Sequence, residues 1–230
     1  MNRVMSRKGI LEVTTEKREK KQSGSTGLRA LQLDEKRDAL LYVPPSYDGQ
    51  HAAPLAAMLH GAGGDAQHGM SLLQPLADAQ GLLLLSPPSR GGTWDIIEEE
   101  RFGTDVLFIS AALQQVFDEY AIDTNRLAIG GFSDGASYAL SLGLINGDLF
   151  THVLAFSPGF YVAPEPKGKP VVFISHGTHD HILPIQHCSR RIVPRLENLQ
   201  YSVWYHEFDG EHVLPDGIRK EAVRWFLKGI

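Results

Sequence analysis

Ser133 stands in the pentapeptide GFSDG (131–135), directly after the apolar stretch RLAIG (126–130). Glycines two positions before and after a serine form the spacing of a nucleophile elbow, in which a strand turns sharply into a helix and presents the hydroxyl group. Side chains at the glycine positions would collide with neighbouring backbone on so sharp a turn. Because glycine and serine are common, the pattern alone also fits a turn residue or a helix cap, so the interpretation depends on the partners of Ser133.

A serine hydroxyl becomes an effective nucleophile only beside a base, and that base needs an acid to orient it. The apolar run VVFISHG (171–177) is followed by Asp180, and the run VWYHEF (203–208) is followed by His212. Both runs are typical of buried strands, and in the α/β-hydrolase fold the chain order is serine, acid, histidine. We therefore expect Ser133 as the nucleophile, Asp180 as the orienting acid and His212 as the base.

Hydrolysis of an acyl group passes through an oxyanion, which needs two preorganised N–H donors. Asp134 follows the serine at the start of the expected helix, so its N–H group is one candidate. The stretch LHGAGGDA (59–66) follows another apolar run, and its glycines let the backbone turn an N–H group toward the site. We expect the second donor to be the N–H of Ala62, with His60 packed or hydrogen-bonded beneath this loop.

Two acidic residues compete with Asp180 for the role of the orienting acid. Asp209 and Glu211 lie close to His212 on the same loop, so both are within reach of its ring. An acid that orients an imidazole usually comes from a separate strand end, which favours Asp180. The two neighbours of His212 remain alternatives at this point.

Histidines and glycines raise two further alternatives, a metal site and a dinucleotide site. His176, His179 and His181 surround Asp180, but the spacing HGTHDH differs from the HxHxDH of metallo-β-lactamase-like hydrolases. The stretch GAGGDA (61–66) matches a loose dinucleotide pattern, yet the acidic residue expected about 20 positions later is missing. We therefore predict no metal and no cofactor.

Short apolar runs alternate with stretches of helical period along the chain. Strands are expected at 27–33, 37–47, 54–61, 81–88, 126–133, 152–159, 169–177 and 201–210, and helices at 65–80 with a break at Pro75, at 104–122, after Ser133, at 185–200 and at 217–230. Near-continuous apolar strands that alternate with helices indicate a mostly parallel sheet covered by helices on both faces. Ligands bind such a sheet beyond the carboxyl ends of its strands, where the expected reactive residues also lie.

Four motifs in register, LHGAGG, GFSDG, HGTHDHILP and GEHVLP, resemble the phospholipase/carboxylesterase family of α/β-hydrolases, which are small serine esterases without a substantial lid. The resemblance extends from Leu31 to Ile230, and Trp94-Asp95 matches a pair common in that family. It implies the same triad and the same oxyanion donors as the residues above. The acyl-protein thioesterase branch often carries glutamine after the nucleophile, whereas this chain carries Asp134, which weakens any transfer of thioesterase specificity.

The chain has 230 residues and a net charge of −5, which gives no reason to expect nucleic acid or an anionic membrane as a partner. Met1–Gly27 carries seven Lys and Arg against three Glu, so we expect a flexible basic tail at 1–27 and one catalytic domain at 28–230. The tail lacks the apolar segment of a secretory signal, and a single cysteine, Cys188, excludes an intrachain disulfide. A cytoplasmic location is therefore expected, and the oligomeric state stays open between monomer and homodimer.

These residues predict a serine carboxylester hydrolase that cleaves short- to medium-chain acyl esters of small molecules through an acyl-enzyme intermediate. No long insertion could form a lid, so little apolar surface is expected to bury a long acyl chain. Trp94, Phe160 and Tyr161 lie near expected strand ends and are candidates for the wall of the substrate pocket, or for ordinary packing. An acyl thioesterase or lysophospholipase of the same fold is the nearest alternative, and a non-catalytic binding module is the alternative from another class.

Overall fold

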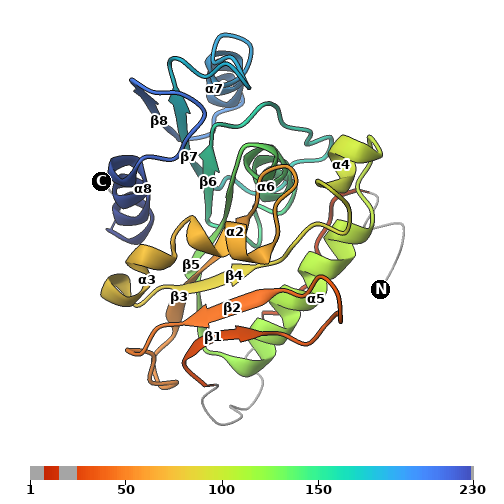
Figure 1. The fold of residues 1–230 in the computed structure, drawn as a ribbon, viewed down its shortest axis with the longest axis vertical. Helices are drawn as coiled ribbons and strands as arrows, with labels where there is room; N and C mark the ends of the chain where they lie inside the picture. Colours follow the sequence, from red (N-terminus) through yellow and green to blue (C-terminus); the bar gives the residue numbers. More distant parts are fainter. Residues whose placement is uncertain (1–7, 16–24, 229–230) are drawn as a thin grey trace.

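Eight strands form one sheet in the computed structural model, which describes residues 8–15 and 25–228 of the chain. Their order in the sheet is β1-β2-β4-β3-β5-β6-β7-β8 (Figure 1). The β1–β2 and β2–β4 pairs are antiparallel and all the other pairs are parallel, which confirms the mostly parallel sheet. The strands are β1 (Gly27–Ala30), β2 (Leu40–Val43), β3 (Ala53–Leu59), β4 (Leu83–Ser86), β5 (Ile122–Phe132), β6 (His152–Phe156), β7 (Val171–Gly177) and β8 (Val203–Phe208).

Helices cover both faces of this sheet, as the sequence predicts. One face carries α2 (Ala66–Ser71), α3 (Gln74–Gln80) and α8 (Asp216–Lys228), which lie on the same side of the sheet in Figure 1. The other face carries α5 (Thr104–Glu119), α6 (Asp134–Ile145) and α7 (Ser189–Asn198). A further helix, α4 (Asp95–Glu98), is only four residues long. None of the helices in the described part of the chain combines the length and the apolar character needed to cross a membrane.

The sequence of β3 shows why both faces need a cover of helices. Leu55 and Ala57 contribute to the core on the side of α5 and α6, whereas Ala56 and Met58 contribute to the core on the side of α2, α3 and α8. Successive side chains of a strand point to opposite faces of the sheet. A strand that is apolar at every position is therefore stable only where helices bury both of its sides.

The segments after the parallel strands leave the carboxyl edge of the sheet without an inserted helical flap. Within the described residues, the helices that follow β5 in the chain are α6, α7 and α8, and each packs on a face of the sheet. The connection between β6 and β7 contains no helix in this part of the chain. The connection between β4 and α5 contains α4, which is only four residues long. In the described part of the chain no long helix is therefore inserted at the carboxyl edge, which agrees with the expected lack of a substantial lid.

The observed elements are mostly shorter than the expected ranges, and three of the differences have a clear physical reason. The break at Pro75 separates α2 from α3, and the proline lies in the first turn of α3, where its missing N–H group costs nothing. Strand β5 begins at Ile122 rather than at 126, because the exposed polar residues Thr124 and Asn125 carry no apolar signal. Helix α4 was not expected, since four residues are too few to show a helical period.

Residues 8–15 pack against the helical layer formed by α5 and α6. Leu11 is 8% exposed, and its N–H group donates to Asn146 Oδ1 at 2.8 Å. Asn146 Nδ2 donates in turn to the carbonyl oxygen of Gly9 at 2.8 Å. One amide side chain at the end of α6 thus satisfies two polar backbone groups, as the neighbouring strand of a sheet would.

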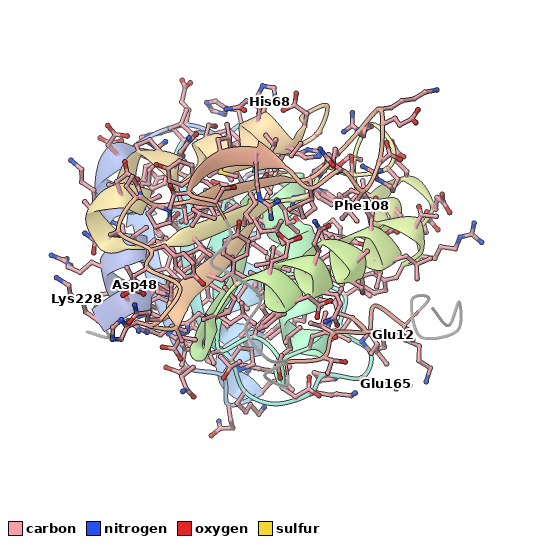
Figure 2. All side chains as sticks on the ribbon, turned by 90° about the horizontal axis from the view of Figure 1, so that it is seen from below. Glu12, Asp48, His68, Phe108, Glu165 and Lys228 are labelled. Atoms are coloured by element: carbon pink, nitrogen blue, oxygen red, sulfur yellow. The ribbon has the colours of Figure 1, made fainter. Side chains whose placement is uncertain are left out.

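This packing corrects the expected organisation of the N-terminal segment. Figure 2 shows Glu12 and Glu165 at the same end of the molecule, where Lys8 forms an ion pair with Glu165 at 3.0 Å. The expectation of a flexible tail does not hold for residues 8–15, because Leu11 is buried and the N–H groups of Leu11, Glu12 and Thr14 donate to side chains of α5 and of the end of α6. The rest of the expected tail before Ser25, at 1–7 and 16–24, lies outside the described residues.

Candidate active site

Ser133 occupies a sharp turn between β5 and α6. Its backbone angles are φ 59° and ψ −121°, a conformation that costs free energy in a residue with a side chain and persists only where the surroundings hold it. One such restraint is the hydrogen bond from the Ser133 N–H group to the carbonyl oxygen of Phe156, at the end of β6, over 2.9 Å. The strained turn between strand and helix is the geometry that the GFSDG spacing predicts.

Gly131 and Gly135 are required because other backbone approaches them too closely for a side chain. A Cβ atom on Gly131 would lie 2.5 Å from the carbonyl carbon of Gly135, and one on Gly135 would lie 2.3 Å from the carbonyl oxygen of Leu59. Both distances are far shorter than non-bonded carbon contacts allow. The start of α6 therefore packs directly on the end of β3, and this contact brings the loop after β3 to Ser133.

Asp180 and His212, on the loops after β7 and β8, form a hydrogen-bonded pair. The carboxylate can only accept, so His212 Nδ1 donates to Asp180 Oδ2 at 2.6 Å, which leaves Nε2 of the neutral ring unprotonated. Asp180 is 4% exposed, and its Oδ1 accepts the N–H groups of Ile182 and Leu183 at 2.9 and 2.8 Å. Burial raises the pKa of Asp180, but the hydrogen bonds from His212 and Leu183 outweigh it, so the pKa is lowered and the group stays charged.

The ring of His212 lies beside the residue that precedes Ser133. The ring centroids of Phe132 and His212 are 4.7 Å apart, and the ring planes are tilted by 41°. Within the described residues no hydrogen bond joins the Ser133 hydroxyl to His212; such bonds are often long without substrate and shorten when it binds. The structure therefore brings Ser133, Asp180 and His212 to the same edge of the sheet, with the last two in direct contact.

The alternative acids on the loop of His212 make other contacts. The Asp209 side chain is 92% exposed and pairs with His179 Nδ1 at 3.0 Å. Glu211 is exposed as well. A carboxylate in open solvent interacts only weakly with a neighbouring charge, because water screens it. Asp180 is the buried acid whose oxygen reaches the ring of His212.

His60 anchors the loop that follows β3, as the sequence predicts. Its Nε2 accepts the N–H group of Ser89 at 2.9 Å, so the ring proton sits on Nδ1, which donates to the carbonyl oxygen of Gly61 at 2.7 Å. Burial lowers the pKa of His60. The ring therefore stays neutral and keeps the acceptor nitrogen that binds Ser89.

The carbonyl group of Gly61 fixes the direction of the next N–H group. It accepts both His60 Nδ1 at 2.7 Å and the Gly64 N–H group at 3.1 Å. The C=O and N–H groups of a trans peptide point in opposite directions, so the Ala62 N–H group points away from His60 and Gly64. Gly61 itself faces the elbow, since a Cβ atom placed on it would lie 3.4 Å from Ser133 Cβ.

Neither the Ala62 nor the Asp134 N–H group has a hydrogen-bond acceptor among the described residues. Asp134 begins α6, so its N–H group lies at the positive end of the helix dipole. The Asp134 side chain accepts the hydroxyl of Thr93 at 2.7 Å, which ties the elbow to the loop before α4. The loop after β3 and the start of α6, which meet at Ser133, thus each hold one N–H group without an acceptor among the described residues. Donors of this kind can stabilise a negatively charged oxygen.

Trp94 packs in the core, which is the second of the two roles that the sequence leaves open for it, and it does not line the surface around Ser133. The side chain is completely buried, its ring stacks on Tyr138 at a centroid distance of 4.9 Å, and its Nε1 donates to the carbonyl oxygen of His60 at 2.9 Å. An indole ring is most stable in the core where its N–H group finds an acceptor, and the carbonyl of His60 is that acceptor. Trp94 therefore supports the loop after β3 from the core.

Exposed apolar side chains stand on the loops at the carboxyl edge. Phe160 is 37% exposed after β6, whereas Tyr161 is half-buried and packs against the core, so Phe160 is the more accessible of the two. Three further exposed apolar residues follow the ends of β6, β7 and β8 within a few positions: Val162, Ile182 and Val213. Two of these are on the loops that carry the candidate acid and histidine. The edge around the candidate site is therefore partly apolar.

His176 is a buried neighbour of Asp180 and belongs to no metal cluster among the described residues. Its Nδ1 lies 2.7 Å from Ser189 Oγ, and its Nε2 lies 2.8 Å from the carbonyl oxygen of Leu183 and 3.2 Å from Asp180 Oδ2. Burial lowers the pKa of His176, so the ring stays neutral. His179 turns outward to Asp209. In the part of the chain that the structure describes, no three His, Cys, Asp or Glu side chains are placed to hold a metal ion.

Two buried carboxyl groups, Asp95 and Asp105, hold the segment between Trp94 and α5. The Asp95 N–H group donates to Asp105 Oδ2 at 2.7 Å, and the Asp105 N–H group donates to Asp95 Oδ2 at 3.0 Å. The hydroxyl of Tyr138 donates to Asp95 Oδ1 at 2.9 Å. Burial, and then the charge of Asp95, raise the pKa of Asp105 to about 7, because two adjacent carboxylates cannot both ionise easily in the core.

The model of one protein family, described as phospholipase/carboxylesterase, matches residues 97–217 of this sequence. The match covers more than half of the 230 residues and includes Ser133, Asp180 and His212. The chain belongs to the phospholipase/carboxylesterase family. Its fold is the α/β-hydrolase fold, as expected from the alternation of strands and helices.

Curated proteins similar to this family member include two esterases of fungi. The probable feruloyl esterase C of Aspergillus clavatus is 30% identical over 157 residues, which cover 64% of this chain and 56% of that protein. The bifunctional acetylxylan esterase/xylanase XynS20E of Neocallimastix patriciarum is 29% identical over 157 residues, covering 65% of this chain and 22% of that protein. The alignments thus span about half of the first relative and less than a quarter of the second.

Solved structures of esterases share the fold of this family member. Esterase PE8 superposes with a TM-score of 0.67 and 22% identity, covering 89% of this chain and 100% of that one. The Bacillus cereus carboxylesterase superposes with a TM-score of 0.62 and 22% identity, covering 84% of this chain and 94% of that one. At this level of identity the likeness shows the fold alone.

Sequence reasoning missed residues that hold the site from behind. Ser89 and Thr93 lie in the stretch PPSRGGTW (87–94), which has the composition of an ordinary turn. Each nevertheless binds one of the two segments that meet at Ser133, through His60 and Asp134 respectively. The signal that could have found them is their place after β4, since every loop after a parallel strand reaches the carboxyl edge.

The carboxyl pair beside Trp94 predicts a particular pH dependence of stability. The pKa of Asp105 is about 7 in the folded chain and near 3.8 in the unfolded chain. The folded chain therefore binds this proton more tightly, and the resulting stability is complete below pH 3.8 and is lost as the pH rises to about 7. Asp105→Asn should therefore gain stability relative to the natural chain as the pH rises from 4 to 7.5, by on the order of 3 kcal/mol. Urea unfolding of both proteins across this range measures the difference, and a constant offset at every pH would contradict it.

Proposed function

We propose that the chain is a serine carboxylester hydrolase in which Ser133 is the nucleophile, His212 the general base and Asp180 the orienting acid. The observation that carries this proposal is the 2.6 Å hydrogen bond between His212 Nδ1 and Asp180 Oδ2, at the sheet edge that also holds the strained turn of Ser133. A buried carboxylate on Nδ1 fixes the tautomer whose Nε2 can take a proton, and it stabilises the charged ring that results.

The proposed reaction has two acyl-transfer steps. His212 Nε2 takes the hydroxyl proton as Ser133 Oγ bonds to the ester carbonyl carbon, and the N–H groups of Ala62 and Asp134 stabilise the oxyanion. The carbon–oxygen bond to the alcohol then breaks, and the alcohol leaves with the proton from His212. Water attacks the acyl-enzyme with His212 again as base, and the acid product and free Ser133 result. No step needs a cofactor or a metal ion.

The proposed substrates are small-molecule esters with short to medium acyl groups. Each buried methylene of an acyl chain contributes only about 0.8 kcal/mol. The loops at the carboxyl edge carry Phe160, Ile182 and Val213 as exposed apolar side chains, which are the proposed contacts of the acyl group. The acyl groups in the names of the relatives, acetyl and feruloyl, are both candidates for this chain. An acyl thioester is the competing substrate for the same residues, although Asp134 after the nucleophile departs from the glutamine that the thioesterase branch often carries.

The proposed cellular setting is the cytoplasm, with no nucleic acid or membrane as a partner. A single free cysteine, Cys188, which is buried, suits a reducing compartment. A net charge of −5 offers no electrostatic attraction to polyanions. Sedimentation of the purified chain distinguishes a monomer from a homodimer.

Replacing the nucleophile tests the reaction class. Ser133→Ala should lower kcat for p-nitrophenyl esters by roughly 10⁴ to 10⁶, because no other group forms the acyl-enzyme, while the circular dichroism spectrum stays unchanged. A fluorophosphonate should add once to the natural chain, at Ser133, and mass spectrometry of the peptides locates it. Activity retained in the alanine variant, or a label at another residue, would refute the assignment.

Replacing the two competing acids tests the role of Asp180. Asp180→Asn should lower kcat by about 10⁴, because an amide at this position favours the wrong tautomer of His212. Asp209→Asn is the matched control, since this exposed acid pairs with His179 and should leave kcat nearly unchanged. Steady-state kinetics of both variants decide the question, and a larger loss in the Asp209 variant would reverse the assignment.

A series of acyl groups tests the substrate class. The value of kcat/KM should rise from acetyl to butyryl or hexanoyl esters and fall for longer chains, because the exposed apolar side chains of the carboxyl edge can bury only the first few methylenes. Methyl ferulate and a matched butyryl thioester extend the series to the aryl acyl group and to the competing bond. A steady rise to palmitoyl esters, or a preference for the thioester, would assign the site to lipids or to thioesters instead.

A further inference from the structure

Arg37 joins the loop between β1 and β2 to both segments that support the oxyanion donors. Its Nε donates to the carbonyl oxygen of Ser89 at 2.8 Å, and its Nη2 donates to the carbonyl oxygen of Gly64 at 3.0 Å. The same Nη2 lies 3.4 Å from Ser89 Oγ. One half-buried guanidinium group therefore bridges the loop after β3 and the loop after β4.

The carbonyl that Arg37 holds belongs to the tight turn that orients Ala62. Gly64 returns a hydrogen bond from its N–H group to the carbonyl of Gly61 at 3.1 Å, and it packs on His60 so closely that a Cβ atom would lie 2.9 Å from Nδ1. A shift of Gly64 would therefore move the Gly61 carbonyl, and with it the N–H group on the other side of the same peptide.

We infer that Arg37 is a positioning residue for the oxyanion-binding loop at 60–64, a role that rests on the proposed function and extends it. Arg37 lies outside the motifs that carry the reaction and touches neither Ser133 nor the donors themselves. It fixes the Ala62 N–H group through Gly64 and Gly61, and it fixes the same loop a second time through Ser89, whose N–H group binds His60.

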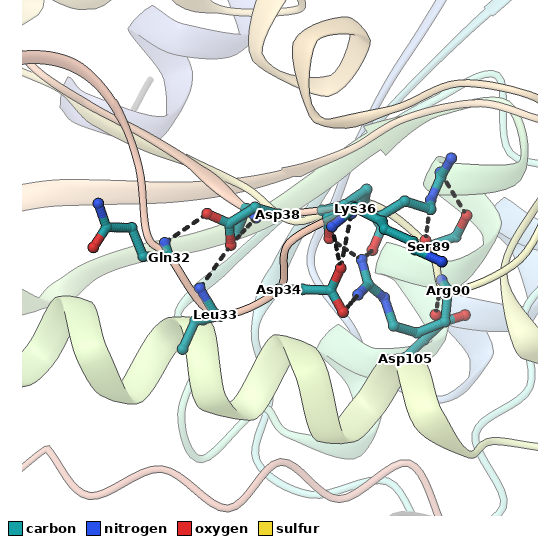
Figure 3. A network of polar contacts seen from close by, with 11 residues as sticks. Gln32, Leu33, Asp34, Lys36, Asp38, Ser89, Arg90 and Asp105 are labelled. Carbon is teal, nitrogen blue, oxygen red and sulfur yellow. Dashed lines mark hydrogen bonds and ion pairs between the residues drawn. The ribbon is translucent and has the colours of Figure 1, made fainter.

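Arg37 is itself held in place by its neighbours in the loop between β1 and β2. Asp34 Oδ1 accepts the N–H groups of Lys36 and Arg37, each at 2.8 Å, and Arg90 donates to the carbonyl oxygen of Arg37. Figure 3 shows Arg90 between Asp34 and Asp105. The Arg90 side chain lies 3.4 Å from Asp34 Oδ2, and the Arg90 N–H group donates to Asp105 Oδ1 at 2.6 Å. The guanidinium of Arg90 also lies 3.7 Å above the ring of Phe108, which is labelled in Figure 2.

The fork of a guanidinium group explains why arginine suits this position. Two donors in one rigid plane reach Ser89 and Gly64 together, whereas a lysine ammonium is a single point that can satisfy only one geometry at a time. The positive charge also opposes protonation of His60, which burial already disfavours by lowering the pKa of its ring. A neutral His60 keeps the acceptor that Ser89 needs.

The test compares transition-state binding with substrate binding in variants of Arg37. Loss of a direct oxyanion donor costs about 10²–10³ in kcat, and Arg37→Met displaces a donor without removing it, so kcat should fall by about tenfold to hundredfold with KM nearly unchanged. A trifluoromethyl ketone mimics the oxyanion adduct, so its inhibition constant should rise by the same factor as kcat/KM falls. Arg37→Lys should lie between the natural chain and Arg37→Met.

Arg29→Met is the matched control, because Arg29 lies on β1, the strand before the loop of Arg37. Its partners are Glu119 and Tyr120, and none of its interactions among the described residues involves residues 60–64. Arg29→Met should leave kcat and the inhibition constant unchanged. A partly unfolded variant has a smaller active fraction, which lowers the apparent kcat but leaves the inhibition constant unchanged. A lower kcat with an unchanged inhibition constant in Arg37→Met would therefore assign Arg37 a structural role and overturn the inference. Unchanged kcat in Arg37→Met would overturn it as well. An inactive natural chain would instead refute the proposed function.

Discussion

The contact between the start of α6 and the carboxyl end of β3 is the constraint on which the candidate site depends. Gly135 lies so close to the carbonyl oxygens of Leu59 and His60 that a Cβ atom would stand 2.3 and 2.4 Å from them. Only a glycine permits this approach, and the approach places the turn of Ser133 next to the glycine-rich loop after β3. The strain at Ser133 follows, because the chain must reverse within one residue to enter α6 so near to β3.

Backbone contact alone would not fix the directions of the N–H groups, and polar side chains behind the site supply that control. His60, Thr93 and Arg37 each bind a backbone or side-chain group of the two segments that meet at Ser133. Trp94 closes the arrangement from the core through its bond to the His60 carbonyl. Donors held in this way need little reorganisation when charge develops on the substrate, which is the property that makes an oxyanion site effective.

The sequence predicts the fold, and it identifies the residues of the candidate site where a short motif follows an apolar run. Ser133, Asp180 and His212 are of this kind, since each lies within a few residues of a strand end that its own neighbours define. Leu11 and Arg37 are not, because their roles depend on contacts with residues 135 and 27 positions away. A basic segment next to an expected domain looks like a mobile tail until the pairing of Leu11 with Asn146 is known, and no local pattern encodes that pairing.

Three histidines that are not exposed to solvent lie close to the candidate site, and their partners explain why only His212 keeps a ring nitrogen without a partner among the described residues. Both ring nitrogens of His60 are engaged, by the Ser89 N–H group and the Gly61 carbonyl, and both nitrogens of His176 are engaged by Ser189 and Leu183. Burial keeps these two rings neutral and fixed, which suits a structural role. His212 differs, because Asp180 occupies Nδ1 while Nε2 has no partner among the described residues. Nε2 of His212 therefore has no partner in the described part of the chain, and the Nδ1 of the same ring donates to a buried carboxylate. A carboxylate in that position stabilises the positive charge of the ring when Nε2 takes up a proton.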